Sequence, residues 1–178
     1  KFFVIFWSVL LVGIIGVFVF FWLISAGKLG FMPTFEELEN PNNRFASEVY
    51  FADGPIMNRY FEKENRKYIE YREIPQSVID ALIATEDVRF YDHSGIDVRG
   101  LFRVAKGLLT ANTSAGGGST ISQQLAKMLF PRESDLNVFE LVIRKFREWV
   151  IAVRLEKSYT KEEILTMYLN KYDFLNLA

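Results

Sequence analysis

The 178-residue sequence predicts a mainly α-helical protein that begins with a membrane-spanning helix. Residues 2–24 contain no charged side chain, and from Pro75 onward apolar residues recur at helical spacing. A short pair of strands is predicted between these two regions. The expected organisation is a transmembrane helix at residues 1–26, a juxtamembrane connector at 27–45, a β-hairpin region at 46–72 and a helical domain at 73–178.

The apolar segment is long enough to cross a bilayer. Its 23 residues would span about 34 Å as a helix, compared with about 30 Å of hydrocarbon. The apolar part of a cleaved signal peptide is normally about 7 to 15 residues long, so a membrane span is the better interpretation. Lys1 and Lys28 are the only charges near the segment, and they do not determine its orientation.

Composition excludes several classes of function. The 21 basic and 22 acidic residues nearly cancel, so the whole chain has no bias toward nucleic acid. The absence of cysteine excludes thiol catalysis, thiolate metal sites and disulfides. With His93 as the only histidine, a metal site built from imidazoles is disfavoured, and no metal ligands are predicted.

The hairpin region is predicted by a turn signal between two apolar runs. Residues 46–51 and 56–61 have the composition of short strands, and Asp53-Gly54 between them favours a tight turn.

The first two helices of the domain are predicted by apolar spacing. One begins with Pro75 at its first helical position, and its apolar residues are Val78, Ile79, Leu82 and Ile83. The next covers residues 98–109, with a single apolar stripe formed by Leu101, Phe102, Ala105, Leu108 and Leu109.

Three further helices are predicted from residues that typically begin or end a helix. One runs from about Thr120 to Phe130, where Pro131 ends it. A longer one covers residues 137–157, and the last begins with a capping box between Thr160 and Glu163 and ends near Asn170. The side chains expected to face inward from the longer helix are Leu141, Val142, Phe146, Trp149, Val150 and Val153.

Glu86 and Asp87 close the first helix of the domain. The apolar residues before them should draw this end toward the core, where burial disfavours the ionised form and a carboxylate accepts a proton more readily. The last turn of a helix is also an unfavourable place for an anion. Glu86 is therefore a candidate general base.

A basic run follows these acidic residues. Residues 98–132 contain five Lys or Arg and no Asp or Glu. Within this run, Gly116-Gly117-Gly118-Ser119-Thr120 precedes a helix start, where free N–H groups favour phosphate. The pattern is not a Walker loop, and a glycine run before a helix is also typical of a flexible loop. A phosphate-bearing substrate beside carboxylates is the favoured interpretation.

A second carboxylate is accompanied by cations. Arg144 and Glu148 are four residues apart and share a helix face, with Arg147 nearby. Such cations stabilise the ionised form of a carboxylate. An exposed helical salt bridge, worth about 0.3–0.5 kcal/mol, remains the alternative.

Four segments, in this order, resemble the motifs of the family 51 peptidoglycan glycosyltransferases: residues 86–95, 117–127, 144–148 and 163–170. These enzymes are the polymerising domains of class A penicillin-binding proteins and the monofunctional transglycosylases. Met128 departs from the family, in which Asn commonly follows Lys127. The sequence ends before the family's fifth motif, which predicts an N-terminal fragment with a C-terminally incomplete glycosyltransferase domain.

The resemblance implies a lysozyme-like, mainly α-helical domain that polymerises lipid II into glycan strands, with inversion at the anomeric carbon and release of polyprenyl diphosphate. It implies that Glu86 is the catalytic base and that Glu148 is a second catalytic carboxylate assisting the diphosphate. Basic positions around the diphosphate correspond to Lys127, Arg144 and Arg147. Polar positions lining the cleft correspond to Ser119 and Gln124, while His93 is expected to brace the loop after Glu86.

The resemblance also implies location and partners. The expected location is the bacterial cytoplasmic (inner) membrane, with a single pass and the catalytic domain on the outer, periplasmic side. The expected partners are lipid II, the growing glycan strand, the membrane and other cell-wall synthesis proteins, with no nucleic acid. No cofactor is required, and a divalent cation, Mg²⁺ or Mn²⁺, at the diphosphate is left open. A lysozyme-like peptidoglycan hydrolase or lytic enzyme and an inactive membrane-anchored scaffold remain the alternative functions.

Overall fold

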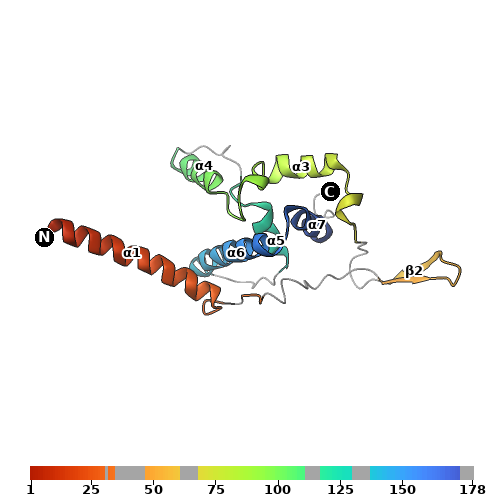
Figure 1. Cartoon of the computed structure of the whole chain (residues 1–178), viewed down its shortest axis with the longest axis horizontal. Coiled ribbons are helices and arrows are strands. Elements are labelled where there is room, and N and C mark those ends of the chain that lie inside the picture. The colour runs from red at the N-terminus through yellow and green to blue at the C-terminus, as the bar shows by residue number, and fades with distance from the viewer. Residues whose placement is uncertain (31, 35–46, 61–67, 111–116, 130–136, 173–178) are drawn as a thin grey trace.

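The structure is a computed structural model that describes the chain except for residues 31, 35–46, 61–67, 111–116, 130–136 and 173–178. The described part contains six α-helices, two 3₁₀ turns and one two-stranded antiparallel sheet. Helices α5, α6 and α7 lie at the centre, α3 and α4 lie on one side of them, and α1 projects away from this body (Figure 1). The prediction of a mainly α-helical protein is confirmed.

Helix α1 covers Phe2–Ser25 and is long and apolar enough to cross a membrane. Most of its large side chains are exposed, as suits a helix surrounded by lipid. Its C-terminal end packs on α6, Val138–Ser158, where the rings of Phe20 and Phe21 meet Phe146 edge-on at 5.3 and 5.6 Å. Arg154 also donates a 2.9 Å hydrogen bond to the carbonyl of Ser25. The C-terminal end of α1 is therefore held against α6 by side-chain contacts, in addition to the chain that connects the two helices.

The hairpin prediction is confirmed by β1, Ser47–Tyr50, and β2, Ile56–Tyr60, which pair antiparallel. Gly54 in the turn has a φ of +105°, a conformation that glycine adopts without strain. Ala46 and Phe61, the predicted outer ends of the two strands, and most of the predicted connector lie outside the described residues.

The core is formed mainly by α5, Ile121–Leu129, together with α6 and α7, Lys161–Lys171. Helix α5 buries Ile121, Leu125 and Ala126 because it lies between the other two helices. The 3₁₀ turns Tyr71–Glu73 and Phe90–Asp92 border this core. Its buried apolar members are Ile74, Ile79, Phe90, Ile121, Leu125, Ala126, Ile151, Leu155, Ile164, Leu165 and Tyr168.

Helix boundaries agree closely with the sequence patterns. Helix α4 covers Val98–Leu109 as predicted, and α7 begins after a capping box between Thr160 and Glu163. Helix α3, Gln76–Glu86, begins one residue later than predicted, because Pro75 has an extended ψ of 137° and caps the helix from outside. The predicted end of α5 at Phe130 lies outside the described residues.

The inward face predicted for α6 is only partly correct. In α6 the residues that reach the core are Ile151, Ala152 and Leu155, whereas Leu141 and Val142 are exposed. Helix α6 has a second apolar face, around Phe146, which packs against α1. The stripe of α4 is also exposed at Phe102 (74%) and Leu109 (89%), because α4 lies at the edge of the helical body (Figure 1). Periodicity identified these helices but not the surroundings of their apolar faces.

Gly95 lies where the loop after α3 meets the backbone of α6. Its φ is +95°, and a Cβ placed there would lie 2.8 Å from the carbonyl carbon of Ala152. Its carbonyl accepts hydrogen bonds from Thr120 Oγ1 at 2.8 Å and Gln123 Nε2 at 3.2 Å. Gly95 therefore allows the loop, α5 and α6 to approach one another closely.

Gly95→Ala is expected to lower the free energy of unfolding by about 3 kcal/mol, because it adds a backbone clash to the cost of a positive φ. Urea unfolding in detergent measures this change. Gly54→Ala is the matched control, since Gly54 also has a positive φ but a Cβ added there would meet nothing within 4 Å; a loss of about 1 kcal/mol is expected. Equal losses in both variants would contradict the role of close packing at Gly95.

Candidate active site

A pocket of about 430 Å³ opens between the end of α3, the loop that follows it, α4 and the segment before α5. Its wall includes Glu86, Arg89, Arg103, Ser119 and Gln124. Volumes of this order are typical of small-molecule sites. The pocket therefore brings together a predicted carboxylate, both predicted polar residues and part of the basic run.

Glu86 is the last residue of α3 and is half-buried at the pocket wall. Its Oε2 accepts a 2.8 Å hydrogen bond from Nε2 of Gln124 on α5. The two residues are 38 positions apart in sequence, so this contact depends on the packing of α3 against α5. Glu86 is thereby held at the pocket as a hydrogen-bond acceptor.

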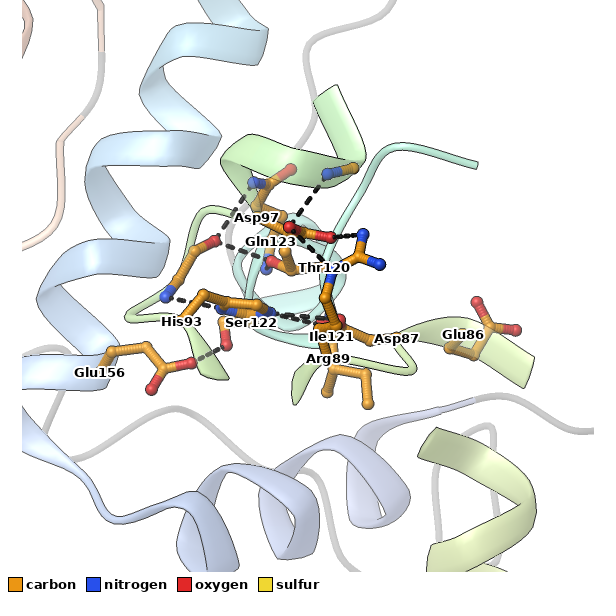
Figure 2. A network of polar contacts seen from close by, with 12 residues as sticks. Glu86, Asp87, Arg89, His93, Asp97, Thr120, Ile121, Ser122, Gln123 and Glu156 are labelled. Carbon is orange, nitrogen blue, oxygen red and sulfur yellow. Dashed lines mark hydrogen bonds and ion pairs between the residues drawn. The ribbon is translucent and has the colours of Figure 1, made fainter. Parts of the chain in front are cut away.

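Asp87, the next residue, points away from Glu86 into a buried network (Figure 2). It is 6% exposed, and its Oδ2 accepts hydrogen bonds from the Ile121 N–H and from His93 Nε2, each at 3.0 Å. This carboxylate therefore joins the end of α3 to the start of α5. This role of Asp87 had no signal in the sequence, because its contact with Ile121 spans 34 residues.

Two N–H groups at the start of α5, where phosphate is predicted to bind, already have partners within the protein; phosphate binding here stays a prediction. The N–H of Ile121 is bonded to Asp87, and the N–H of Gln123 is bonded to Thr120 Oγ1 at 3.2 Å. A helix N-terminus attracts an anion, and here that anion is a carboxylate of the protein itself. Gly117 and Gly118 line the pocket, while Gly116 lies outside the described residues.

His93 braces the loop after Glu86, as expected. Its Nδ1 accepts a 3.2 Å hydrogen bond from the N–H of Gly95, so Nε2 carries the proton that is donated to Asp87. The side chain is only 8% exposed. These contacts indicate that His93 stabilises the conformation of this loop.

The second predicted carboxylate, Glu148, lies on α6 and is 12% exposed. Lys145 forms an ion pair with it at 2.9 Å between Nζ and Oε2, and the same Nζ donates to Ser119 Oγ at 2.9 Å. The sequence spacing had favoured Arg144 as the partner of Glu148. Lys145 was missed although its spacing of three residues from Glu148 also places both on one helix face.

The three predicted basic residues are placed differently. Lys127 is exposed in the last turn of α5, three residues after Gln124, and Arg144 is half-buried beside Lys145. The guanidinium of Arg147 lies against Gly30, where any side chain would overlap it. None of the three lines the described pocket, so their substrate-binding roles remain predictions.

Arg89 and Asp97 form an ion pair at the pocket wall and fix the start of α4. Arg89 donates through Nε and Nη2 to the two carboxylate oxygens, and Asp97 Oδ1 also accepts the N–H of Gly100 at 3.0 Å. The hydrogen bond from Arg89 and then that from Gly100 hold the pKa of Asp97 below its usual 3.8. Asp97 is therefore ionised in the folded protein at neutral pH.

Asp97→Asn is expected to destabilise the fold at neutral pH and to have little effect in acid. A lowered pKa contributes stability above the unfolded value of 3.8, and this contribution is lost as the pH falls through the folded value. Urea unfolding at about pH 7 and about pH 3 measures the difference. Asp53→Asn in the hairpin turn is the control. A pH-independent loss in Asp97→Asn would show that the carboxylate charge is not the cause.

The described residues contain no group of three His, Cys, Asp or Glu side chains arranged to hold a metal ion. Asp87 and Asp97 at the pocket already have partners in His93 and Arg89.

The geometry combines a proton acceptor with a cation-bearing wall. Glu86 lines the pocket from α3, and Ser119 connects the same pocket to Lys145 and Glu148 on α6. A substrate in the pocket could lose a proton to Glu86 while negative charge developing elsewhere on it is stabilised near Ser119 and Lys145.

The chain is similar in sequence to a known protein family and to several known proteins. A family model described as Transglycosylase matches residues 53–177. The chain is 39% identical over 140 residues to penicillin-binding protein 1A of Escherichia coli (strain K12), covering 79% of this chain and 16% of that protein. It is 43% identical over 111 residues to penicillin-binding protein 1F of Bacillus subtilis (strain 168), covering 62% and 15%. The chain thus spans about a sixth of the length of these relatives.

Proposed function

This chain belongs to the transglycosylase family, family 51 of the glycosyltransferases, and we propose that it carries the site of a peptidoglycan glycosyltransferase that polymerises lipid II. The observation that carries the proposal is the shared pocket, which Glu86 and Ser119 both line, together with the hydrogen bond from Lys145 to Ser119. A base at the pocket and a cation bonded to a hydroxyl of its wall suit the transfer of a sugar from a diphosphate.

The proposed reaction begins at Glu86. Its carboxylate takes the proton from the 4-hydroxyl of the acceptor sugar as that oxygen attacks the anomeric carbon of the donor. The bond from this carbon to the polyprenyl diphosphate breaks on the opposite face, so the α-linkage becomes β. The products are a lengthened glycan and polyprenyl diphosphate.

The leaving diphosphate needs stabilisation of negative charge. Ser119 supplies a hydroxyl at the pocket wall. Lys145 supplies a cation that is bonded to this hydroxyl, and the Lys145–Glu148 ion pair fixes the ammonium group. We assign Glu148 the role of holding Lys145 toward the diphosphate, with Lys127, Arg144 and Arg147 as predicted additional cations.

A hydrolase is less well supported. A glycosidase must protonate a poor sugar leaving group and therefore needs a carboxylic acid near it. Here Glu86 accepts a hydrogen bond from Gln124, and Glu148 is paired with the ammonium group of Lys145 and does not line the pocket. A diphosphate leaves without such an acid, so the contacts of Glu86 and Glu148 are compatible with transfer from a diphosphate.

The proposed location is the bacterial cytoplasmic membrane, with α1 as a single-pass anchor and the catalytic domain on the outer side. Anchoring would keep the pocket near lipid-linked substrates that diffuse in the bilayer. The proposed partners are lipid II, the growing glycan strand and other cell-wall synthesis proteins. No resident cofactor is proposed; Mg²⁺ or Mn²⁺ would accompany the diphosphate of the substrate.

The test uses purified protein, in the full length that its gene encodes, with lipid II in detergent or liposomes. Polymeric glycan and polyprenyl diphosphate are expected as products, and finished glycan is expected to remain intact. Release of sugars from finished glycan without consumption of lipid II would support the hydrolase instead. Activity on neither substrate would support the scaffold.

A further inference from the structure

A buried tyrosine on α7 contacts the partner of Glu86. Tyr168 is 1% exposed, and its hydroxyl donates a 3.0 Å hydrogen bond to Oε1 of Gln124. The other end of the same amide, Nε2, donates to Glu86 at 2.8 Å. Three helices, α7, α5 and α3, are thus connected in one chain of hydrogen bonds that ends at the pocket.

The chain has a fixed direction. If the Gln124 amide were turned around, its oxygen would face the Glu86 carboxylate, and two acceptors would then oppose each other. Burial, followed by the negative charge of Glu86, raises the pKa of Tyr168 well above 10.0, so its hydroxyl keeps its proton and remains a donor. The Glu86 carboxylate thus favours the amide orientation in which Nε2 faces it, and the Tyr168 hydroxyl holds the other end of that amide by donating to Oε1.

We propose that Tyr168 is a positioning residue for the base: through Gln124, it sets the orientation and location of the Glu86 carboxylate at the pocket. This inference rests on the proposed function, since it requires Glu86 to be the base. The ring of Tyr168 belongs to the core and stacks on that of Tyr172 at 5.3 Å. The hydroxyl adds a role that the ring alone does not have.

Loss of the hydroxyl should affect the chemical step more than substrate binding. Proton transfer requires the base to lie within about 2.6–3.2 Å of the acceptor hydroxyl, and small displacements of a reacting group reduce the rate strongly. Tyr168 does not line the pocket, so its hydroxyl has no expected contact with lipid II.

The test is a double-mutant cycle on the purified full-length protein with lipid II as substrate. Tyr168→Phe keeps the ring and is expected to lower kcat about fivefold to tenfold, with KM changed less than about twofold. Gln124→Met, similar in size, is expected to lower kcat at least about tenfold. The double variant should be no slower than Gln124→Met, because Tyr168 acts through Gln124.

Tyr91→Phe is the matched control, since it removes a hydroxyl whose partner is Tyr71 and lies outside the pocket; its kcat should equal that of the wild type. Thermal unfolding of each variant separates loss of activity from loss of fold. Wild-type kcat in Tyr168→Phe, or losses that multiply in the double variant, would overturn the inference and leave the proposed function standing. A wild-type protein that forms no polymer from lipid II would overturn the proposed function itself.

Discussion

Glu86→Gln is expected to abolish detectable chain growth, with kcat lowered by about 10²- to 10⁴-fold. Glutamine has nearly the same size and can still accept the hydrogen bond from Gln124, but it cannot take a proton from the acceptor hydroxyl. The measurement is the rate of glycan formation from lipid II, with lipid II binding and thermal unfolding measured in parallel. Binding and stability should change little, because the side chain keeps its volume and lies at the pocket wall.

Glu162→Gln is the control for this prediction, because it removes an exposed carboxylate from α7 outside the active-site pocket. Its polymerisation rate should match that of the wild type. Unaltered polymer yield from Glu86→Gln would contradict the assignment of Glu86 as the base. A loss explained entirely by unfolding would also leave that assignment unsupported.

Lys145→Met is expected to lower kcat/KM by about 10²- to 10³-fold, similar to the loss of a donor that stabilises developing negative charge. The substitution keeps most of the aliphatic side chain but removes the ammonium group that contacts both Ser119 and Glu148. Glu148 would then lose its observed ion-pair partner close to where the diphosphate charge is proposed to develop. The steady-state kinetics of lipid II polymerisation measure the effect.

Lys157→Met is the matched control, since Lys157 is an exposed lysine on the same helix, about three turns away from Lys145. It should reduce polymerisation less than about twofold. If Lys145→Met were equally mild, the diphosphate would not be stabilised at Lys145, and the proposed leaving-group site would be wrong.

Local sequence signals predicted the helices well because the ends of helices depend on nearby residues. Thr160 and Glu163 cap α7 within a single turn, and the apolar spacing of residues 98–109 matched the bounds of α4. The predicted start of α3 at Pro75 differs from the observed start by only one residue. These features need no knowledge of the rest of the chain.

What each helix packs against depends on contacts between residues far apart in the sequence. The two apolar faces of α6 could not be ranked from sequence, since one packs on the core and the other meets Phe20 and Phe21 of α1. The exposed stripe of α4 has the same periodicity as a buried one. Periodicity therefore predicts that a helix is amphipathic but not what its apolar face contacts.

The site was predicted in part. Glu86, Ser119 and Gln124 do share one pocket, whereas Arg147 lies against Gly30 near the end of α1. Lys145 was missed because Arg144 and Lys145 are both plausible partners for Glu148 by spacing, and only the side-chain conformation distinguishes them. Sequence spacing places cations on a helix face, but packing determines which of them reaches the carboxylate.

The most direct test of the whole arrangement is an experimental structure of the full-length protein with two bound ligands: a lipid diphosphate sugar as donor and an acceptor glycan. The account predicts diphosphate oxygens within hydrogen-bond distance of Lys145 Nζ and Ser119 Oγ, and the acceptor 4-hydroxyl about 2.6–3.2 Å from a Glu86 oxygen. A diphosphate bound away from α6, or an acceptor hydroxyl that does not reach Glu86, would contradict it.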